Sequence, residues 1–356
     1  MLSLGSVAAS ENVTSDEISN NDFVSLSVYS TLEVENDDVN TQETENEVSL
    51  ETNNKKTRSS RDVLKVSNNS PLKADPKGNT FADINQAIND TSSGETVFLN
   101  GKNYNGNQQI TIDRDITIDG ASKSNSNLVS ILDANGTYRI FNSGKHNVVL
   151  KNLIFENPDL SVTGYCAYFA KGGNLTIQNV TIRNIKGTLN TTIAILLAGG
   201  STVNANNLTF NNNSIITNNS NYNGLLFRAG PSSNVTMSNL NIYDNNISAL
   251  NNLRGFVYVG GSSNVNMSNL NIYNNNVSAQ NNIIGFVRVN SLSEINIANV
   301  NFYNNYFEAK QDIEGIFLHY FNSTAICSDL TFENNKVLNY TQFRSFVRAS
   351  LNSTLV

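Results

Sequence analysis

The chain has 356 residues, a formal net charge of -7, 15% charged side chains, 2 cysteines, 2 histidines and no tryptophan. No apolar run approaches the roughly 20 residues that cross a bilayer, which excludes a membrane-spanning protein. Two cysteines exclude a disulfide scaffold, and so few cysteines and histidines give us no reason to expect a metal or a cofactor. Asparagine is the dominant polar residue, with 65 positions.

The acidity is concentrated at the start of the chain. Residues 1–62 hold 13 acidic and 4 basic groups, whereas residues 142–356 hold 9 acidic and 12 basic groups. Residues 10–62 have few aromatic residues and no sustained period of 2 or 3.6, which predicts an acidic disordered segment. The alternative is a solvated acidic face on a folded element. Basic residues are not clustered enough to indicate nucleic-acid binding.

Residues 1–9 are typical of the end of a secretory signal. A short apolar stretch runs into small residues around Ala8 and Ala9, and the first basic residue is Lys55. We expect residues 1–9 to be a signal remnant, with cleavage near Ala9 and an extracellular or cell-surface location. The alternative is a cytosolic protein with an accidental apolar start.

The first folded elements are predicted from residue 80 onward. Thr80 can cap a short helix, with Asp83 at the capping-box position and Phe81, Ile84 and Ile88 on one face. The pattern of residues 93–104 predicts a strand and a turn. The pattern of residues 109–120 predicts two strands joined at residues 113–115. The helix is expected to cover one end of a larger array of strands.

An internal repeat dominates the rest of the chain. The segments NVTMSNLNIYDNN from Asn234 and NVNMSNLNIYNNN from Asn264 are 30 residues apart, and related segments follow on the same interval. Equivalent pivot positions are occupied by Asn152, Asn179, Asn207, Asn239, Asn269, Asn299 and Asp329. A second pattern, led by glycine, follows the same interval at Gly224, Gly255, Gly285 and Gly315, so each repeat contains at least two strands.

Side-chain parity shows where each repeat bends. Val235 and Met237 share one parity, and Leu240 and Ile242 share the other. Because strand side chains alternate with period 2, this change predicts a corner at Asn239. Asparagine tolerates left-handed backbone angles, and stacked asparagines can form an amide ladder. The pivot asparagines are therefore predicted to be structural.

Stacked coils of about 30 residues give a continuous apolar core, which predicts an all-β right-handed parallel β-helix over residues 63–356. A two-sheet sandwich would need closely spaced hairpins, which the interval does not provide. The order TFADINQAI, GETVFLNGKNY, ITIDRDITIDG and then the NVxMSNLxI repeats resembles the pectin-lyase-like β-helices, most closely the adhesin-like surface proteins of methanogenic archaea. The resemblance implies a cell-envelope protein that mediates attachment, and it transfers no catalytic residue.

The last repeat is expected to stop in the middle of a coil. LNSTLV from Leu351 aligns with FNSTAI from Phe321 at a shift of 30 residues. An uncapped coil would present an open strand edge, and such edges pair with other chains. Edge-to-edge self-association is therefore one expected interaction.

Candidates for catalysis are few. On the glycine-led strands the expected outward side chains are those of Tyr258, Arg288, Leu318 and Arg348. In the N-terminal coils Asp113, Asp115, Asp119 and Asp133 lie near Arg139, and the first two are interpreted as turn residues. His146 and His319 lie about six coils apart and cannot cooperate. The same separation applies to Cys166 and Cys327, so no disulfide is expected, and Cys327 falls in the inward column of Met237.

Two aromatic columns are candidates for a binding surface. The first is an outward ladder of Tyr243, Tyr273 and Tyr303. The second consists of Phe256, Phe286 and Phe346, flanked by Arg288 and Arg348, although a bulge at the neighbouring glycine would reverse the parity of these rings. Stacked aromatic rings also brace solenoids without binding anything. Among the Asn-X-Ser/Thr sequons, Asn246 and Asn276 are the better glycosylation candidates.

Three functions remain open from the sequence. The favoured one is a non-catalytic adhesin-like protein that binds glycans or proteins of other cells through a repetitive face. The alternatives are a polysaccharide lyase or glycosidase of the same fold and a structural spacer of the envelope.

Overall fold

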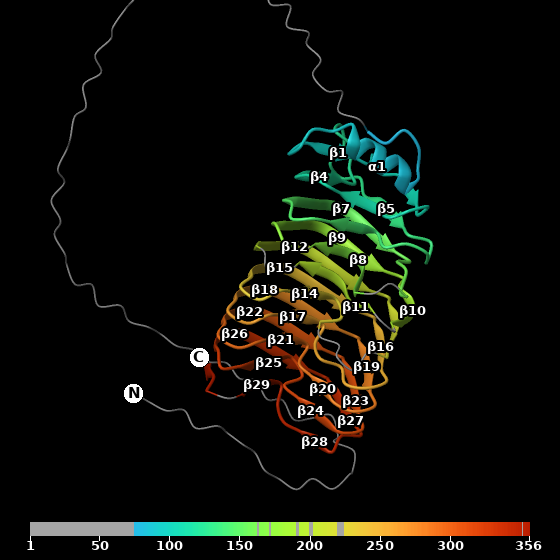
Figure 1. The fold of residues 1–356 in the computed structure, drawn as a ribbon. Helices are drawn as coiled ribbons and strands as arrows, with labels where there is room; N and C mark the ends of the chain where they lie inside the picture. Colours follow the sequence, from blue (N-terminus) through green and yellow to red (C-terminus); the bar gives the residue numbers. More distant parts are fainter. Residues whose placement is uncertain are drawn as a thin grey trace, which may run out of the picture.

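The computed structural model describes residues 75–161, 164–170, 172–189, 192–198, 202–218, 224–350 and 352–356. The predicted signal remnant and acidic segment lie outside these residues. The described part is an all-β, right-handed parallel β-helix of about 8 turns with about 30 residues per turn (Figure 1). The fold class predicted from the repeat is therefore confirmed.

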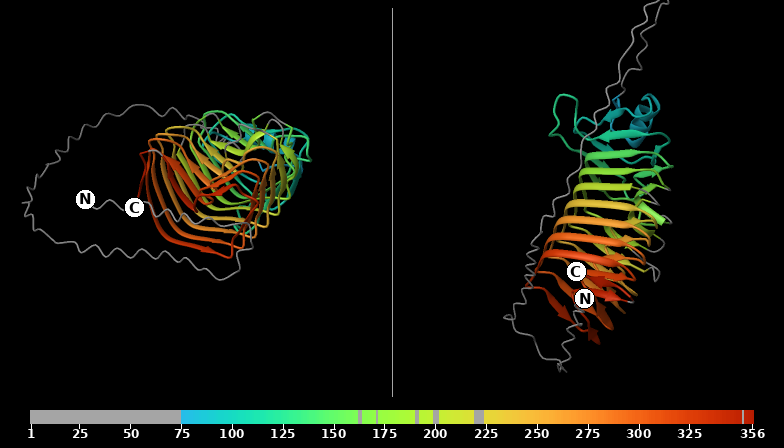
Figure 2. Two further views of the ribbon diagram at one scale, coloured as in Figure 1. Left: turned by 90° about the horizontal axis from the view of Figure 1, so that it is seen from below. Right: turned by 90° about the vertical axis from the view of Figure 1, so that its left-hand side faces the viewer.

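The solenoid contains four parallel sheets, and the coils toward the C-terminus contribute a strand to each of them. One coil runs through β18 (Asn264–Tyr273), β19 (Asn276–Ala279), β20 (Ile283–Ile284) and β21 (Val287–Val289). We number the sheets to which these strands belong 1 to 4, in that order. The strands stack on their equivalents in the next coil, as Figure 2 shows from the side and along the axis.

Sheet 1 is the longest. Its strands are β1 (Thr96–Phe98), β4 (Ile116–Asp119), β7 (Val148–Glu156), β9 (Leu175–Arg183), β12 (Thr202–Asn211), β15 (Asn234–Tyr243), β18, β22 (Glu294–Tyr303), β26 (Thr324–Glu333) and β30 (Thr354–Leu355), joined at one side by β2 (Asn103–Asn105) and β5 (Ser130–Asp133).

The other sheets are narrower. Sheet 2 contains β10 (Lys186–Leu189), β13 (Ser214–Thr217), β16 (Asn246–Ala249), β19, β23 (Tyr306–Ala309) and β27 (Lys336–Leu338). Sheet 3 contains β20, β24 (Asp312–Glu314) and β28 (Gln342–Phe343). Sheet 4 contains β3 (Ile110–Ile112), β6 (Phe141–Ser143), β8 (Gly164–Ala170), β11 (Thr192–Ala198), β14 (Phe227–Ala229), β17 (Val257–Val259), β21, β25 (Leu318–Phe321) and β29 (Val347–Ser350).

The predicted helix caps the first coil. Helix α1 (Phe81–Asn89) begins after Thr80, whose side chain accepts a bond from the backbone N–H of Asp83 while the Asp83 carboxylate accepts one from the backbone N–H of Thr80. This reciprocal pair is the predicted capping box. Ile84 and Ile88 are buried. The helix therefore closes one end of the apolar core with the face that its sequence pattern indicated.

The pivot asparagines adopt the predicted geometry. Asn239, Asn269 and Asn299 all have φ of 56°, in the left-handed region, and each bends its strand of sheet 1. Hydrogen bonds from the side-chain amide of one pivot to Oδ1 of the pivot before it join the column. They measure 2.9 Å (Asn179 to Asn152), 3.1 Å (Asn207 to Asn179), 3.2 Å (Asn269 to Asn239) and 3.1 Å (Asn299 to Asn269). One rung differs, since Asn239 donates to Asn206 rather than to Asn207. Asn239 follows Asn207 by 32 residues, whereas the neighbouring pivot intervals are 28 and 30 residues, and this longer interval accompanies the change of partner.

A second asparagine ladder lies inside the solenoid and was not predicted. It occupies the corner between sheets 1 and 2, at Asn213, Asn245, Asn275, Asn305 and Asn335. Each of the first four donates its backbone N–H and its side-chain amide to Oδ1 of the next asparagine. These four side chains are at most 2% exposed. The sequence carries a signal for it, an asparagine repeated at the same interval, but other asparagines of the repeat stand beside it.

A serine ladder at the corner between sheets 4 and 1 was also missed. Ser233, Ser263 and Ser293 are buried, and the backbone N–H of each donates to Oγ of the next serine at 3.0–3.2 Å. The hydroxyls of Ser233 and Ser263 in turn donate to the carbonyls of Gly230 and Gly260. Buried polar side chains thus satisfy backbone groups at these two corners of the solenoid.

The last coil is less covered than the others. Phe332, Val337 and Phe343 pack against the core but remain partly exposed, and β26 pairs on this side only with the two residues of β30. Self-association through this edge stays a prediction. In the described residues no helix is long and apolar enough to cross a membrane.

Candidate functional site

The tyrosine column is a continuous stack on the outer face of sheet 1. Tyr243, Tyr273 and Tyr303 follow buried core residues at the ends of β15, β18 and β22. Neighbouring ring centroids are 4.9 Å apart, with interplanar angles of 3° and 4°. Burial, and then the neighbouring tyrosines and Asp244, raise the pKa of Tyr273. The phenol therefore keeps its proton, and with it a hydrogen-bond donor, at neutral pH.

Polar groups lie on both sides of this column. On sheet 1, Asn301 donates to Asn271 at 2.9 Å and Asn271 donates to Asn241 at 3.0 Å. On sheet 2, beyond the corner, a shallow hollow of about 460 Å³ is lined by Asn246, Ser248, Asn276, Ser278, Tyr306 and Glu308. A strip of rings, amides, hydroxyls and one carboxylate thus crosses this corner of the solenoid.

The two glycosylation candidates lie in this hollow. Asn246 and Asn276 are exposed, and they are the first residues of β16 and β19 rather than turn residues. The amide of Asn276 donates to Oδ1 of Asn246 at 3.3 Å. Their modification stays a prediction.

The predicted phenylalanine surface was wrong for two of its three rings. Phe256 and Phe286 are 1% and 2% exposed and stack inside the core with centroids 3.9 Å apart, while Phe346 is partly buried against the same core. The preceding Gly255 and Gly285 have φ of 82° and 68°. A left-handed residue reverses the side-chain parity, so the rings that simple alternation pointed outward turn inward.

The outward side chains of sheet 4 form what we call the arginine column. Strand register places Arg228, Tyr258, Arg288, His319 and Arg348 side by side. The prediction that Leu318 belongs to this set was wrong, since Leu318 is buried and pairs with Val287. Val287 to Leu318 spans 31 residues and Leu318 to Val347 only 29, so one extra residue in this coil brings His319 into the column.

Side chains of sheet 3 meet the arginine column. Arg254 follows Leu253, which bridges to Ile283, and Glu314 pairs with Ile284. Glu314 forms ion pairs with Arg348 and, at 3.5 Å, with Arg344, and Arg344 also contacts Asp312 at 3.3 Å. Burial and the nearby Arg254 lower the pKa of Arg288.

Aromatic rings also contact the column. The guanidinium of Arg228 lies 5.1 Å from the centroid of Tyr258, and that of Arg288 lies 5.3 Å from the centroid of Phe321. Such contacts favour a cation over a ring face. They hold the arginines in place without neutralising their charge.

His319 is the most enclosed member of the column. It is 2% exposed, its Nε2 lies 3.0 Å from Oγ of Ser350, and its ring centroid lies 4.5 Å from that of Phe321. Burial, and then Arg348 and Arg288, lower the pKa of His319 to about 3. The imidazole is therefore neutral in the folded protein at neutral pH. Six steps of sheet 4 separate β25 from β6, next to His146, so the two histidines do not meet.

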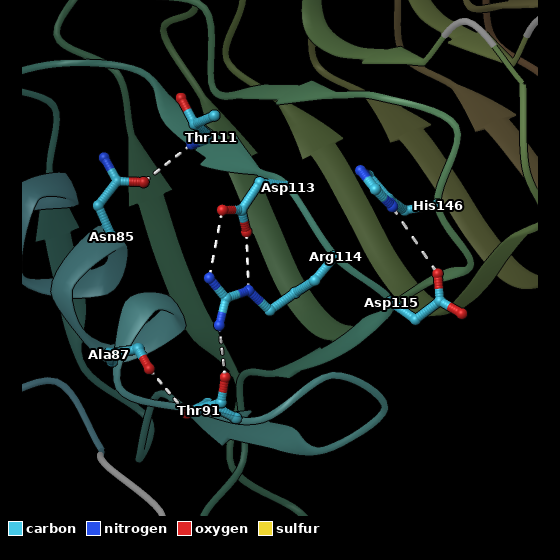
Figure 3. A network of polar contacts seen from close by, with 8 residues as sticks. All are labelled: Asn85, Ala87, Thr91, Thr111, Asp113, Arg114, Asp115 and His146. Atoms are coloured by element: carbon cyan, nitrogen blue, oxygen red, sulfur yellow. Dashed lines mark hydrogen bonds and ion pairs between the residues drawn. The ribbon is translucent and has the colours of Figure 1, made fainter.

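The acids near the first coils serve the turns in which they lie (Figure 3). Asp113 pairs with Arg114 at 2.8 Å, and Arg114 also donates to the carbonyl of Thr91 beyond α1. Asp115 accepts from the backbone N–H of Asn147 at 2.8 Å and lies 3.9 Å from His146. The interpretation of Asp113 and Asp115 as turn residues is confirmed.

The other two acids are also engaged. Asp119 is 3% exposed, pairs with Lys151 at 2.9 Å and accepts from Asn152 at 2.8 Å. Asp133 accepts from the backbone N–H of Asn135 at 2.8 Å. These carboxylates orient the backbone and the first rung of the pivot ladder. None of their described contacts brings them together with Arg139.

Both cysteines are free, as expected. Cys166 is fully buried, and burial raises the pKa of its thiol to about 12. Cys327 pairs with Ile297 in the predicted inward column and is partly buried, which raises its pKa to about 11. Within the described residues, no group of three or more His, Cys, Asp or Glu side chains is arranged to hold a metal ion.

The fold and these surfaces define a right-handed parallel β-helix with internal polar ladders and two repetitive outer columns. A scan against protein-family models and a search of curated proteins each gave no match to this chain.

Proposed function

We propose that this protein is a non-catalytic, extracellular or cell-surface adhesin-like β-helix that binds glycans or proteins of other cells through the tyrosine column. The observation that carries the proposal is the parallel stack of Tyr243, Tyr273 and Tyr303 on an outer face. Tyrosine combines a large apolar ring with a hydroxyl, and flat aromatic surfaces of this kind suit both sugar rings and protein side chains.

The surroundings of the column support a repetitive ligand. The amides of Asn241, Asn271 and Asn301 lie on the same face, and each carbonyl and amide retains hydrogen-bonding capacity beyond its single ladder bond. Equivalent groups recur once per coil, about 4.8 Å apart. A polymer with repeated hydroxyl groups could contact several coils at once, so that weak single contacts add up. The resemblance to adhesin-like proteins of the pectin-lyase-like type, noted in the sequence, is consistent with this function.

The contacts of the acidic residues favour binding over catalysis. Glycoside hydrolysis uses two carboxyl groups that face a common substrate, about 5 to 9 Å apart. Asp113, Asp115, Asp119 and Asp133 instead bond to neighbouring backbone and side-chain groups. Among these four described residues we therefore assign no pair to the reaction of the alternative, a polysaccharide lyase or glycosidase.

The test compares three variants of the full chain for binding to immobilised glycans and to fixed cell envelopes. Replacing Tyr243, Tyr273 and Tyr303 together by Ser should weaken binding at least tenfold. Replacing the same residues by Phe should retain more binding, because the rings remain.

A matched control replaces Thr236, Asn266 and Asn296 by Ser at equivalent outward positions of the same three strands. This control should bind like the wild type. Equal binding by the Tyr-to-Ser variant and the wild type would exclude the tyrosine column as the site. Release of reducing ends or unsaturated products from polysaccharides by the wild type would instead favour the enzymatic alternative.

A further inference from the structure

The arginine column and its neighbours on sheet 3 carry an excess of positive charge. The set contains Arg228, Arg254, Arg288, Arg344 and Arg348, whereas the carboxylates described in ion pairs with it are Asp312 and Glu314. Without counting Arg288, four arginines and two carboxylates leave a formal charge of +2. Arginine keeps its proton even when partly buried, so this charge persists at any physiological pH.

Two polar atoms of this set lack a hydrogen-bond partner within the described part of the chain. Nδ1 of His319 and Nε of Arg254 are both buried without a hydrogen bond. His319 is also almost fully enclosed, at 2% exposure. Buried polar atoms are nearly always satisfied, so each such exception asks for a physical explanation. Excess charge together with unsatisfied polar atoms is what a surface presents when its anionic partner is missing.

The same chain contains a segment with the complementary chemistry. Residues 33–51 include eight carboxylates and no basic residue. Glu43, Glu45 and Glu47 alternate with uncharged residues, so in an extended conformation they would point to one side, about 6.6 Å apart. In the column the arginines alternate with Tyr258 and His319, so at about 4.8 Å per step they recur about every 9.6 Å. The long side chains of glutamate and arginine can bridge the difference between the two spacings.

The segment is long enough to reach the column. Twenty-three residues separate Glu51 from Asp75, the first described residue. Such a linker spans about 80 Å when fully extended and about 26 Å on average when flexible. Four steps of sheet 4 separate β3, beside α1, from β14, and eight separate it from β29. At about 4.8 Å per step these separations are about 19 and 38 Å.

We propose that the acidic segment 33–51 docks on the arginine column of its own chain and covers it until an external anion displaces it. The column lies on sheet 4 and the tyrosine column on sheet 1, so this inference does not rest on the proposed function. The contact is electrostatic and partly exposed to solvent, and salt should therefore release it.

A single-tryptophan quenching experiment on the full chain tests the contact, because the natural chain contains no tryptophan. Phe321→Trp places a reporter beside Arg288 and His319. A nitroxide attached to Thr44→Cys lies between two of the glutamates. The Phe321→Trp chain without Thr44→Cys, taken through the same labelling, gives the background from Cys166 and Cys327. At about 20 mM salt the nitroxide should reduce the reporter's fluorescence at least twofold, and 1 M NaCl should restore it.

Three controls decide the outcome. The Tyr303→Trp reporter on sheet 1 should show no quenching. Replacing the eight acids of residues 33–51 by their amides should abolish quenching of the Phe321→Trp reporter without altering any solenoid residue. The double variant Arg254→Gln, Arg288→Gln should also abolish quenching, because it removes two arginines of the surface and leaves the acidic segment unchanged.

The proposal would be overturned by equal quenching of both reporters or by no quenching at low salt. Quenching that appears only when spin-labelled chains are mixed with separate tryptophan-bearing chains would also overturn it. That result would assign the contact to two copies rather than to one chain.

Discussion

The buried side chain of Asn275 accepts two hydrogen bonds from Asn245, one from its backbone N–H at 3.2 Å and one from its amide at 2.9 Å. Its own amide donates to Oδ1 of Asn305 and to the carbonyl of Ile242, both at 2.9 Å. One side chain thus bonds to groups of the preceding and the following coil and links three successive coils. The internal ladder is the part of the fold in which the loss of one residue leaves the most polar groups unpaired.

Asn275→Leu should lower the free energy of unfolding by at least about 3 kcal/mol. The substitution leaves the backbone N–H and amide of Asn245 and the carbonyl of Ile242 without their partners, and an unsatisfied buried group costs about 1 to 3 kcal/mol. Urea unfolding followed by circular dichroism measures the change. Asn271→Leu is the control, because Asn271 belongs to the half-buried outer ladder of the same coil and should cost under about 1 kcal/mol. Equal losses for the two variants would contradict the special role of the internal ladder.

Gly285→Ala should be more damaging than Gly136→Ala. Both glycines have left-handed φ, of 68° and 64°. A Cβ on Gly285 would lie 3.0 Å from Cβ of His319 and 3.0 Å from the carbonyl oxygen of Val287, whereas a Cβ on Gly136 would meet nothing within 4 Å. The backbone strain of about 1 kcal/mol is common to both, so the difference between their melting temperatures isolates the cost of close approach. A smaller effect at Gly285 would show that the two coils are less tightly packed there.

Acid should destabilise the protein partly through His319. Its folded pKa of about 3 lies below the ordinary value of 6.5, so folding favours the neutral ring. This contribution is complete above about pH 6.5 and is lost as the pH falls from 6.5 toward 3, by up to about 1.4 kcal/mol per pH unit. The charged groups that face the ring are Arg288 and Arg348 on the two adjacent strands, whose positive charges oppose protonation of the imidazole. Glu314 forms an ion pair with Arg348.

His319→Gln should therefore flatten the pH dependence. Unfolding free energies measured at pH 7 and pH 4 should differ less for this variant than for the wild type. Parallel curves for His319→Gln and the wild type would mean that the histidine does not titrate in this range.

The two thiols should react slowly and unequally with iodoacetamide at pH 8. Burial raises the pKa of Cys166 to about 12 and that of Cys327 to about 11, so little thiolate is present. Cys327 should react first, because it lies in the less covered last coil. Mass spectrometry of the native chain over time measures the order. Faster modification of Cys166 would contradict the packing of sheet 4.

The sequence predicted the elements whose pattern is local. The capping box of α1 and the left-handed pivots such as Asn239 depend on a few adjacent residues, and both were confirmed. The tyrosine stack followed from strict alternation within one strand. To predict these three features it was enough to know the local sequence and the repeat interval, without the exact register between neighbouring coils.

Features that depend on register between coils were harder to predict. Phe256 was assigned to the wrong face because the left-handed Gly255 reverses parity, which the residue type permits but does not require. Leu318 was exchanged with His319 because one extra residue in that coil is absorbed before β25. The internal asparagines, such as Asn275, lie beside exposed asparagines, so composition did not distinguish the buried column from its neighbours.

Tyrosine nitration during binding tests the central claim most directly. The full chain is bound to cell envelopes or to a glycan that retains it, then treated with tetranitromethane, and nitration at each tyrosine is quantified by mass spectrometry against the free protein. We predict protection of Tyr243, Tyr273 and Tyr303 and unchanged nitration of Tyr138 and Tyr340, which are partly exposed elsewhere. Unchanged nitration of the three stacked tyrosines in the bound protein would contradict the proposed binding surface.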